Sequence, residues 1–473
     1  MAATLVWFRN DLRLADHPAL IAGLGSGRAV VPAYVLDEET DGIRPPGAAS
    51  RWWLHHSLQA LDASLRALGS RLILRRGPAE RVLEDLAAEC DASAIYWNRA
   101  YDQSTRERDA RLKHAFNSRG VVADGLKGNL LFEPWEVRTV SDGSFKIFTA
   151  FWRACRALPA PGAPLPAPKV LPPPPTWPTG AKVSDWRLEP TAPDWAGGLR
   201  ATWTPGEAAA AVRLTTFLDG SLARYRQARD MPAVEATSRL SPHLAFGEIS
   251  PRQIWRAATA RGLSAATEKF LTEIGWREFA YNLLFHHGDL AQRNFRPEFD
   301  AFPWRNSEGA DEEDALDAWR RGRTGYPIVD AGLRELWTTG WMHNRVRMIV
   351  ASFLTKDLLI DWRAGERWFW DTLVDADPAN NAAGWQWVAG SGADAAPYSR
   401  VFNPVLQGEK FDPLGDYVRR WVPELAGLTA ETIHRPWTGA TPLPPEIYPA
   451  RIVDHSAARE RALEAFRTLK QSA

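Results

Sequence analysis

The stretch TLVWF, residues 4–8, opens the pattern that decides the fold class of the first part of the chain. Outward from it, further β-rich runs occur at residues 30–36 (VVPAYVL), 72–74 (LIL), 94–97 (AIYW) and 121–124. Helical patterns separate these runs, most clearly over residues 53–68 and 79–89. Because strands that alternate with helices pair in parallel, we predict a doubly wound α/β domain over residues 1–140.

The chain changes character after this domain. Prolines crowd residues 159–175, and proline fits neither a helix interior nor a sheet interior. We therefore expect an extended, Pro-rich connector over residues 141–203. From about Thr204 the pattern is helical, and both Pro205-Gly206-Glu207 and Ser250-Pro251 are typical helix starts. The predicted fold class is thus α/β plus all-α, with the all-helical domain over residues 204–473.

Bulk composition excludes several classes of protein. Lys and Arg together number 57, as do Asp and Glu, so a nucleic-acid partner needs a local basic patch. No apolar run approaches the roughly 18 residues that span a bilayer, and no secretory signal is visible, so we expect a cytoplasmic protein without membrane contact. The two cysteines, Cys90 and Cys155, cannot build a four-cysteine zinc or iron–sulfur site.

Common catalytic motifs are missing. The sequence contains no GxGxxG or GxxxxGK[ST] after a strand, no HExxH and no GxSxG. Histidines pair at His55-His56 and His286-His287, but neighbouring residues on a helix point to different faces. We therefore predict no metal site.

Polar strings in the helical part indicate a ligand site. Residues 237–241 (TSRLS) can surround a phosphate with short donors, although a helix N-cap is the alternative. Glu273, Trp276 and Arg277 share one helix face, which is either a site or a plain Glu–Arg pair. Two further strings, GWMHNRVRM (340–348) and DADPANN (375–381), hold many polar groups that would be unfavourable to bury without a ligand.

These strings together resemble the photolyase/cryptochrome superfamily. The opening WFRNDLRL (7–14) is similar to the first motif of that family, and six further strings follow in the family's order: TSRLS, EIGWREF (273–279), TGYPIVDAG (324–332), WMHNRVRM, KDLLIDWR (356–363) and residues 375–404. The resemblance implies an N-terminal α/β antenna domain and a C-terminal helical domain that holds FAD.

The resemblance also implies roles for residues around the cofactor. Tyr225 and the string Thr237, Ser238, Arg239, Leu240 and Ser241 would hold the FAD phosphates, with help from Arg277. Arg347 and Asp375 would pair beside the isoalloxazine ring, Asp377 would approach its ribityl chain or edge, and Asn381 would face N5. Trp385, Trp362 and Trp304 match a three-step electron-transfer chain from the flavin to the surface.

The same resemblance implies a DNA substrate. A cavity for a flipped-out cyclobutane pyrimidine dimer would be lined by Glu273, Trp276, Asn344, Met348 and Trp387. A neutral, buried Glu273 would donate a hydrogen bond to the dimer. Contacts to the DNA backbone are expected from Arg229, Arg345, Arg400 and Gln407. We therefore expect an enzyme that repairs these dimers in UV-damaged DNA under blue light, as a monomer.

Subclass features refine this expectation. Members that repair the (6-4) lesion carry histidines where this chain has Asn344 and Met348, and plant cryptochromes usually have Asp where Asn381 stands. The sequence as a whole most resembles class III cyclobutane dimer photolyases. The alternative function is that of a cryptochrome-type photoreceptor that does not repair DNA. Class III resemblance favours 5,10-methenyltetrahydrofolate as antenna, beside Arg51, Trp52 and His55. The Asn-Glu pair of class I folate sites is replaced by Ser104 and Thr105, so a deazaflavin or second flavin stays open.

Overall fold

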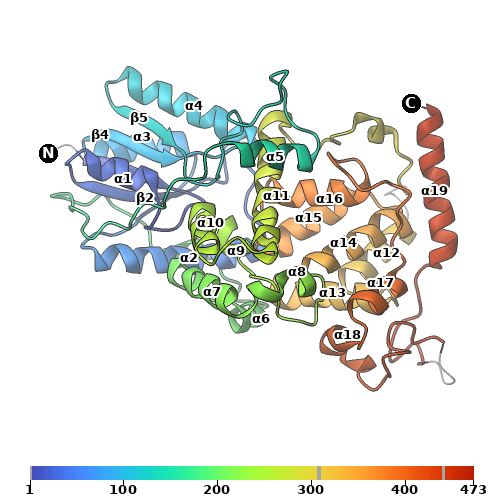
Figure 1. The fold of residues 1–473 in the computed structure, drawn as a ribbon. Coiled ribbons are helices and arrows are strands. Elements are labelled where there is room, and N and C mark those ends of the chain that lie inside the picture. The colour runs from blue at the N-terminus through green and yellow to red at the C-terminus, as the bar shows by residue number, and fades with distance from the viewer. Residues whose placement is uncertain (1–2, 306–309, 439–442, 473) are drawn as a thin grey trace.

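The first part of the computed structural model is a five-stranded parallel sheet between two layers of helices (Figure 1). The structure describes residues 3–305, 310–438 and 443–472. The strands lie in the order β3-β2-β1-β4-β5, and their bounds are β1 (Ala3–Phe8), β2 (Val30–Leu36), β3 (Ile73–Arg76), β4 (Ala92–Asn98) and β5 (Val122–Leu126). The prediction of a doubly wound α/β domain is confirmed.

Alternate side chains of the strands fill two separate cores. On one face, Val6 and Phe8 of β1 pack with α1 (Pro18–Gly25) and α2 (Ala48–Ala67). On the other face, Leu5 and Trp7 pack with α3 (Ala79–Glu89) and α4 (Gln103–Ser118). Since successive side chains of a strand point to opposite faces, a central strand covered on both sides is expected to be largely apolar. TLVWF is apolar apart from Thr4, whose buried hydroxyl makes a hydrogen bond with that of Ser26 at 3.0 Å.

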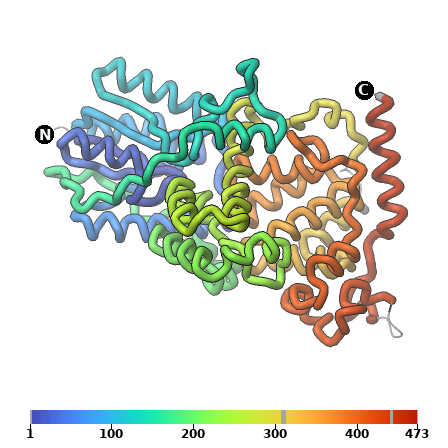
Figure 2. The backbone as a smooth tube through the Cα atoms, in the orientation of Figure 1, coloured from blue at the N-terminus to red at the C-terminus, as the bar shows by residue number. Residues whose placement is uncertain are grey.

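The rest of the chain is helical, and α11 (Ala265–His287) runs through the middle of the molecule, with the sheet domain on one side and α16 on the other (Figures 1 and 2). The other α-helices are α5 (Phe148–Ala157), α6 (Gly197–Thr202), α7 (Glu207–Gly220), α8 (Tyr225–Ala228), α9 (Ser241–Ala245), α10 (Pro251–Thr259), α12 (Ala310–Arg320), α13 (Pro327–Thr339), α14 (Asn344–Ser352), α15 (Trp362–Thr372), α16 (Asn380–Ala389), α17 (Pro404–Phe411), α18 (Asp416–Trp421) and α19 (His455–Ser472). Shorter turns are the 3-10 helices η1 (Val183–Trp186), η2 (Leu222–Arg224), η3 (Pro297–Ala301) and η5 (Pro423–Leu425), and the π-helix η4 (Phe353–Asp357). None of the helices in the described ranges is both long and apolar enough to cross a membrane.

The segment predicted as an extended connector contains helices. Residues 158–182 carry neither helix nor strand, as their prolines predict, but α5 precedes them and α6 follows. Phe148 and Phe151 lie one turn apart on α5, and both pack into the core around α11, where Phe151 lies 5.3 Å from Phe279. The packing of this apolar face on the helical domain stabilises α5, although a Pro-rich sequence follows the helix.

The sheet domain and the helical domain share a hydrophobic core. Trp53 of α2 is fully buried, and its ring packs against Trp203 and Phe246 of the helical part at 5.6 and 6.0 Å. The indole N–H donates to the buried carboxylate of Glu248 at 3.0 Å, which also accepts the backbone N–H of Gly206. The two domains are therefore joined by packing and by hydrogen bonds that water cannot replace.

A buried arginine adds to this contact. Arg13 is completely buried and donates to the backbone carbonyls of Asp16, Gly128 and Gly247 at 2.6 to 3.2 Å. Gly247 lies in the helical part, so one guanidinium connects three separate segments. A buried charge is tolerated only when its hydrogen bonds are satisfied, and these carbonyls meet that need.

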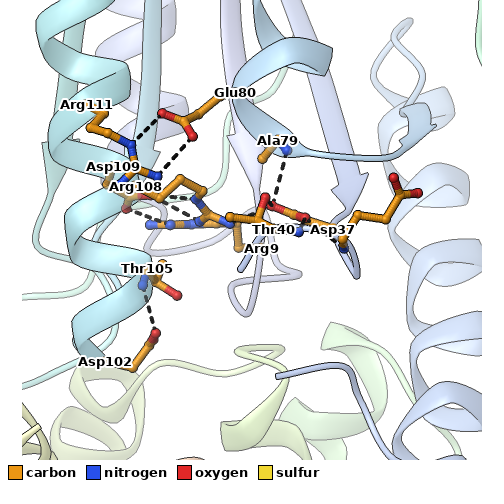
Figure 3. Close-up of polar contacts among 11 residues, drawn as sticks. Arg9, Asp37, Thr40, Ala79, Glu80, Asp102, Thr105, Arg108, Asp109 and Arg111 are labelled. Carbon is orange, nitrogen blue, oxygen red and sulfur yellow. Dashed lines mark hydrogen bonds and ion pairs between the residues drawn. The ribbon is translucent and has the colours of Figure 1, made fainter. Parts of the chain in front are cut away.

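The crevice at the carboxyl end of β1 is filled by side chains (Figure 3). The order in which strands are added to the sheet reverses beside β1, and many α/β proteins bind ligands at such a point. Here Arg9 pairs with Asp109 at 2.7 Å, and Arg108 pairs with Asp37 and Asp109 at 3.1 Å each. Both guanidinium groups lie over the Trp7 ring, at 4.7 and 4.8 Å. The crevice is thus occupied by two cations, two carboxylates and an indole of the protein itself.

Glu278 of α11 is a buried acid at the contact between the two domains. One of its carboxyl oxygens accepts the backbone N–H groups of Leu131 and Phe132, at 2.9 and 3.1 Å. Burial raises the pKa of Glu278 to about 7, although Arg277 at 3.5 Å and these hydrogen bonds act in the opposite direction. The acid is therefore only partly ionised near neutral pH.

We predict that Glu278→Gln makes the stability of the protein less sensitive to rising pH. A carboxyl whose pKa is about 7 when folded and 4.5 when free contributes stability below about pH 4.5, and this stability is lost as the pH rises through 7. The loss amounts to about 3 kcal/mol. In calorimetry from about pH 5 to about pH 8, the Tm of the wild type should fall relative to that of Glu278→Gln. The exposed Glu431→Gln should follow the wild type, and a Tm difference independent of pH would contradict the assignment.

Candidate functional site

One large cavity, with a volume of about 550 Å³, lies in the helical domain. Cofactor and drug-sized ligand sites typically measure roughly 300–1,000 Å³. Its walls come from α8, α9, α11, α14 and α16 and the loops beside them. It is lined by most of the residues that the sequence analysis assigned to FAD and the lesion: Tyr225, Arg229, Ser238, Leu240, Ser241, Glu273, Trp276, Arg277, Asn344, Arg345, Arg347, Met348, Asp375, Asp377, Asn381, Trp385 and Trp387.

Some predicted residues lie outside this lining: Thr237, Arg239, Trp362, Trp304, Arg400 and Gln407, together with the antenna residues Arg51, Trp52 and His55. Arg239 has a left-handed backbone, with φ of 50°, and its guanidinium lies 4.8 Å from the Trp341 ring. Its neighbours Ser238 and Ser241 reach the cavity, and Ser241 accepts the indole N–H of Trp341 at 3.2 Å. Within the TSRLS string, therefore, the serines and Leu240 form the wall.

Arg347 and Asp375 form an ion pair in the cavity wall. One Arg347 nitrogen donates to both Asp375 oxygens, at 2.7 and 3.0 Å, and Nε donates to the carbonyl of Met342 at 2.8 Å. The Asp375 side chain is 2% exposed, whereas that of Arg347 is 24% exposed. A charge-assisted contact of this kind fixes the direction of the guanidinium, and Arg347 can still offer its other donors to a ligand.

Asp377 is held by hydrogen bonds from two sides. One oxygen accepts the Tyr281 hydroxyl at 2.6 Å, and the other accepts the backbone N–H groups of Ala379 and Asn380 at 2.9 and 2.7 Å. Burial and the charge of Asp377 raise the pKa of Tyr281 well above its usual value, so the phenol stays a donor. The Tyr281 ring packs against Tyr101 of the sheet domain at 5.9 Å, which connects this wall to that domain.

The amide of Asn381 has a fixed orientation. Its nitrogen donates to the backbone carbonyl and to a carboxylate oxygen of Glu366, at 3.0 and 2.9 Å. Both partners are acceptors, so the amide carbonyl is the group left to accept a hydrogen bond from a ligand. Arg44 pairs with both oxygens of Glu366 at 2.7 and 2.9 Å, and its guanidinium lies 4.0 Å from the Trp370 ring. An arginine of the sheet domain thus supports a residue of the cavity.

Glu273 differs from the expectation of a neutral, buried acid. Its carboxylate pairs with Arg229 and with Lys269, the latter at 2.9 Å, and its side chain is 26% exposed. Lys269 lies one turn earlier on α11, and Arg229 reaches it from the end of α8. Two cations therefore surround Glu273, because helix spacing and the fold place them at contact distance.

Aromatic side chains form the flat part of the cavity wall. Trp276 stacks on Phe148 of α5, with ring centres 3.8 Å apart and planes within 10°. Since Trp276 also lines the cavity, Phe148 supports one face of the indole while the ring remains available to a ligand. Trp387 and Met348 line the same cavity. The wall is thus apolar next to the charged Glu273.

The four residues predicted to contact DNA fall into two pairs. Arg229 and Arg345 line the cavity, and both lie near Asp230, at 3.8 and 3.2 Å. Arg400 is exposed, and Gln407 is half-buried on α17. The arginines at the cavity are thus neutralised by carboxylates in the free protein, and a phosphate would have to replace these partners.

The three tryptophans of the predicted electron-transfer chain belong to one part of the fold. Trp385 and Trp362 are buried in the same hydrophobic core, and the half-buried Trp304 packs against it. The Trp385 ring lines the cavity and lies 4.9 Å from Phe369. Trp362 is fully buried and donates its indole N–H to Asn294 at 2.9 Å. The order of the three indoles from the flavin to the surface, and their role in electron transfer, stay predictions.

The side chains of α2 that are predicted to bind the antenna chromophore already contact other groups of the protein. Arg51 pairs with Glu38 and donates to the carbonyl of Pro46 at 3.1 Å. Trp52 is 1% exposed, and His55 lies 3.2 Å from Glu189. The structure therefore does not bring these three side chains together around an open space of the kind seen in the helical domain.

Sequence reasoning missed the residues that support the cavity from behind. Tyr281 lies four residues after Arg277 on α11, and this helical spacing was the available signal. Arg44 and Glu366 are 322 residues apart, and no local pattern links them. Lys269, four residues before Glu273, was visible in the sequence as a helical ion pair.

Comparison with known proteins matches this geometry to a family. Residues 4–169 match the family described as DNA photolyase, and residues 270–468 match the FAD binding domain of DNA photolyase. The chain is 51% identical over 481 residues to the deoxyribodipyrimidine photo-lyase of Agrobacterium fabrum, covering 100% of this chain and 99% of that protein. Cryptochrome-1 of Arabidopsis thaliana is 40% identical over 452 residues, covering 92% of this chain and 64% of that protein.

A solved structure agrees over the whole length. The crystal structure of a bacterial class III photolyase from Agrobacterium tumefaciens superposes with a TM-score of 0.95 at 51% identity, covering 100% of this chain and 98% of that chain. The similarity therefore includes both the sheet domain and the helical domain with its cavity. The chain belongs to the DNA photolyase/cryptochrome family.

Proposed function

We propose that this protein repairs cyclobutane pyrimidine dimers in DNA with blue light, using FAD bound in the large cavity. One observation carries the proposal: residues suited to the cofactor and residues suited to the lesion line the same cavity. Cofactor and dimer would then lie in contact, which transfer of an electron between them requires. The name of the Agrobacterium fabrum relative, at 51% identity, supports this activity.

The residues present fit FAD. A diphosphate needs N–H and O–H donors, and Arg277, Ser238 and Ser241 supply them along one side of the cavity. A flavin ring has polar edges and apolar faces, and the wall offers the Arg347–Asp375 pair and the Asn381 carbonyl beside apolar side chains. The donor set and the volume of the cavity are thus both suitable for this cofactor.

FAD, when bound in its reduced form, supplies the electron that opens the dimer under light. The chain itself binds and orients the cofactor and the dimer, and it excludes water from the space between them. Trp276, supported by Phe148, and Trp387 provide apolar surfaces against which a flipped dimer can lie. A dimer has lost aromatic stacking, so removing it from the helix requires less energy than removing a normal base.

Glu273 and Arg229 have paired roles in this proposal. In the free protein they neutralise each other at the cavity. When a dimer enters, Glu273 exchanges Arg229 for a hydrogen bond with the lesion, and Arg229 becomes available to the DNA backbone. Arg345, Arg400 and Gln407 are the further backbone contacts that we propose.

We also propose 5,10-methenyltetrahydrofolate as the antenna chromophore. A second flavin at the carboxyl end of the sheet is disfavoured, because Arg9 and Arg108 with their carboxylates fill that crevice. Arg51 is the most exposed of the residues suggested for the folate, with 31% of its side chain accessible. The expectations of a monomer and of a cytoplasmic location stay predictions.

Repair of a dimer-containing oligonucleotide under blue light tests the proposed function. The purified, FAD-loaded and reduced protein should restore intact pyrimidines only when illuminated. A photoreceptor without repair activity, the alternative, would bind FAD and respond to light but leave the dimer unchanged.

We predict that Glu273→Ala keeps its FAD and slows dimer repair several-fold, because the lesion loses a hydrogen-bond partner. Repair yield per absorbed photon and flavin content are the measurements. Glu268→Ala, on the same helix and paired with Arg156 outside the cavity, is the matched control and should repair normally. Equal yields for both variants would remove Glu273 from the mechanism.

We predict that Trp385→Phe keeps fold and FAD content but largely blocks light-driven reduction of oxidised flavin. Indole is readily oxidised and phenyl is not, whereas both rings can pack against Phe369. Repair by flavin that has been reduced chemically should be spared. Trp97→Phe, a buried substitution in β4, is the control. Wild-type photoreduction in Trp385→Phe would show that this indole is only a core residue.

A further inference from the structure

Three side chains outside the cavity converge beside α2. His55 and His56 are consecutive residues of that helix, and Glu189 belongs to the segment just after η1. His55 Nε2 lies 3.2 Å from one Glu189 oxygen, and His56 Nε2 lies 3.0 Å from the other. Within the described ranges, this is the one group of three or more His, Cys, Asp or Glu side chains whose ligand atoms all lie within 4.8 Å of one another.

The convergence bears on the prediction that adjacent histidines of one helix are poor joint metal ligands. Neighbouring residues do leave a helix in different directions, but Glu189 lies between the two rings and presents one oxygen to each. The rings are 5.1 Å apart at an angle of 77°, and the His56 ring packs against Trp52 at 4.7 Å. A residue distant in sequence therefore completes a site that the helix alone does not form.

Hydrogen bonding leaves part of this cluster unsatisfied. His56 Nε2 is buried and makes no hydrogen bond, although a carboxylate oxygen lies 3.0 Å away, so the contact lacks hydrogen-bond geometry. His55 Nδ1 is likewise buried without a partner, and the His55 side chain is 8% exposed. Buried ring nitrogens without hydrogen bonds are rare, and a cation bound beside Glu189 would satisfy His56 Nε2, which faces it.

We propose that His55, His56 and Glu189 bind one divalent metal ion of the zinc class. Two imidazoles and a carboxylate are a ligand set that zinc uses with three protein ligands and a water. A tetrahedral site with metal–ligand distances near 2.0–2.2 Å places its ligand atoms about 3.3 Å apart. Glu189 presents a different oxygen to each histidine, at 3.2 and 3.0 Å, and one ligand atom from each of the three residues lies within 4.8 Å of the others, which is close to this spacing.

The ion would fasten the segment after η1 to the sheet domain. Trp186 at the end of η1 and Leu188 of the segment after it are already buried in the core that contains Trp52 and Trp53. Glu189 is therefore held near the histidines before any ion binds. Its side chain is 33% exposed, so an ion can enter from solvent and retain a water ligand. None of the three side chains lines the large cavity, so the site is separate from the residues proposed to hold FAD and the dimer.

Zinc titration of the untagged, FAD-loaded and chelator-treated protein tests the proposal. Calorimetry should show one Zn²⁺ per chain, metal analysis after dialysis should give the same ratio, and Zn²⁺ should raise the Tm. His56→Gln and Glu189→Gln should each weaken binding by roughly ten-fold or more, since each removes one of three ligands. Both side chains are partly exposed, so these variants should fold. His114→Gln, which removes an exposed histidine elsewhere, is the matched control.

The outcomes separate the alternatives. Absence of Zn²⁺ binding, or equal binding by wild type, Glu189→Gln and His56→Gln, would overturn the proposal and leave an ion pair that clamps the segment. Loss of binding in both ligand variants but not in His114→Gln would support it. Flavin content and dimer repair should be the same in all four proteins, so failure of the proposed repair function would not affect this result.

Discussion

The carboxylate of Glu366 is almost completely buried, and it can be so only because other groups satisfy it. Arg44 contributes two charge-assisted hydrogen bonds from the sheet domain, and the Asn381 amide contributes one from the cavity. Removing one partner of a buried ion pair typically destabilises a protein by about 3–5 kcal/mol. The loop after β2, helix α15 and helix α16 are therefore locked together, and the orientation of a cavity residue depends on an arginine of the other domain.

Other carboxylates around the cavity are also satisfied by groups of the protein itself. Asp375 is held by Arg347, and Asp377 by Tyr281 and two backbone N–H groups, so each acid has partners before any ligand enters. Such a wall does not need to reorganise when a polar ligand binds, which favours tight binding and a defined geometry. Glu273 is the exception, because its partners are two cationic side chains that also line the cavity. The fixed acids suit a resident cofactor, and the exchangeable one suits a substrate.

Sequence predicts those parts of this molecule that depend on neighbours in the chain. The alternation around TLVWF is sufficient for the sheet, because burial on both faces of a strand is a local pattern. The strings around Asn344 and Asp375 indicate the cavity, because dense polar groups in helices need a partner. Contacts between distant segments leave no such pattern. Arg229 is 44 residues from Glu273, so their ion pair can be seen only in the folded structure. Glu189 is more than a hundred residues from His55 and His56, and the cluster that it forms with them is likewise visible only there.

The crevice filled by Arg9, Arg108, Asp37 and Asp109 has a consequence for protein engineering. The four groups sum to zero charge, so replacing all of them together by small neutral residues would leave no isolated ion behind. Asp37 also accepts the backbone N–H groups of Thr40 and Ala79, which would lose their acceptor. Trp7 would then become the floor of an open, uncharged hollow at the edge of the sheet. The crevice is therefore closed by ion-paired side chains, and an alternative acceptor for these two N–H groups is the condition for opening it.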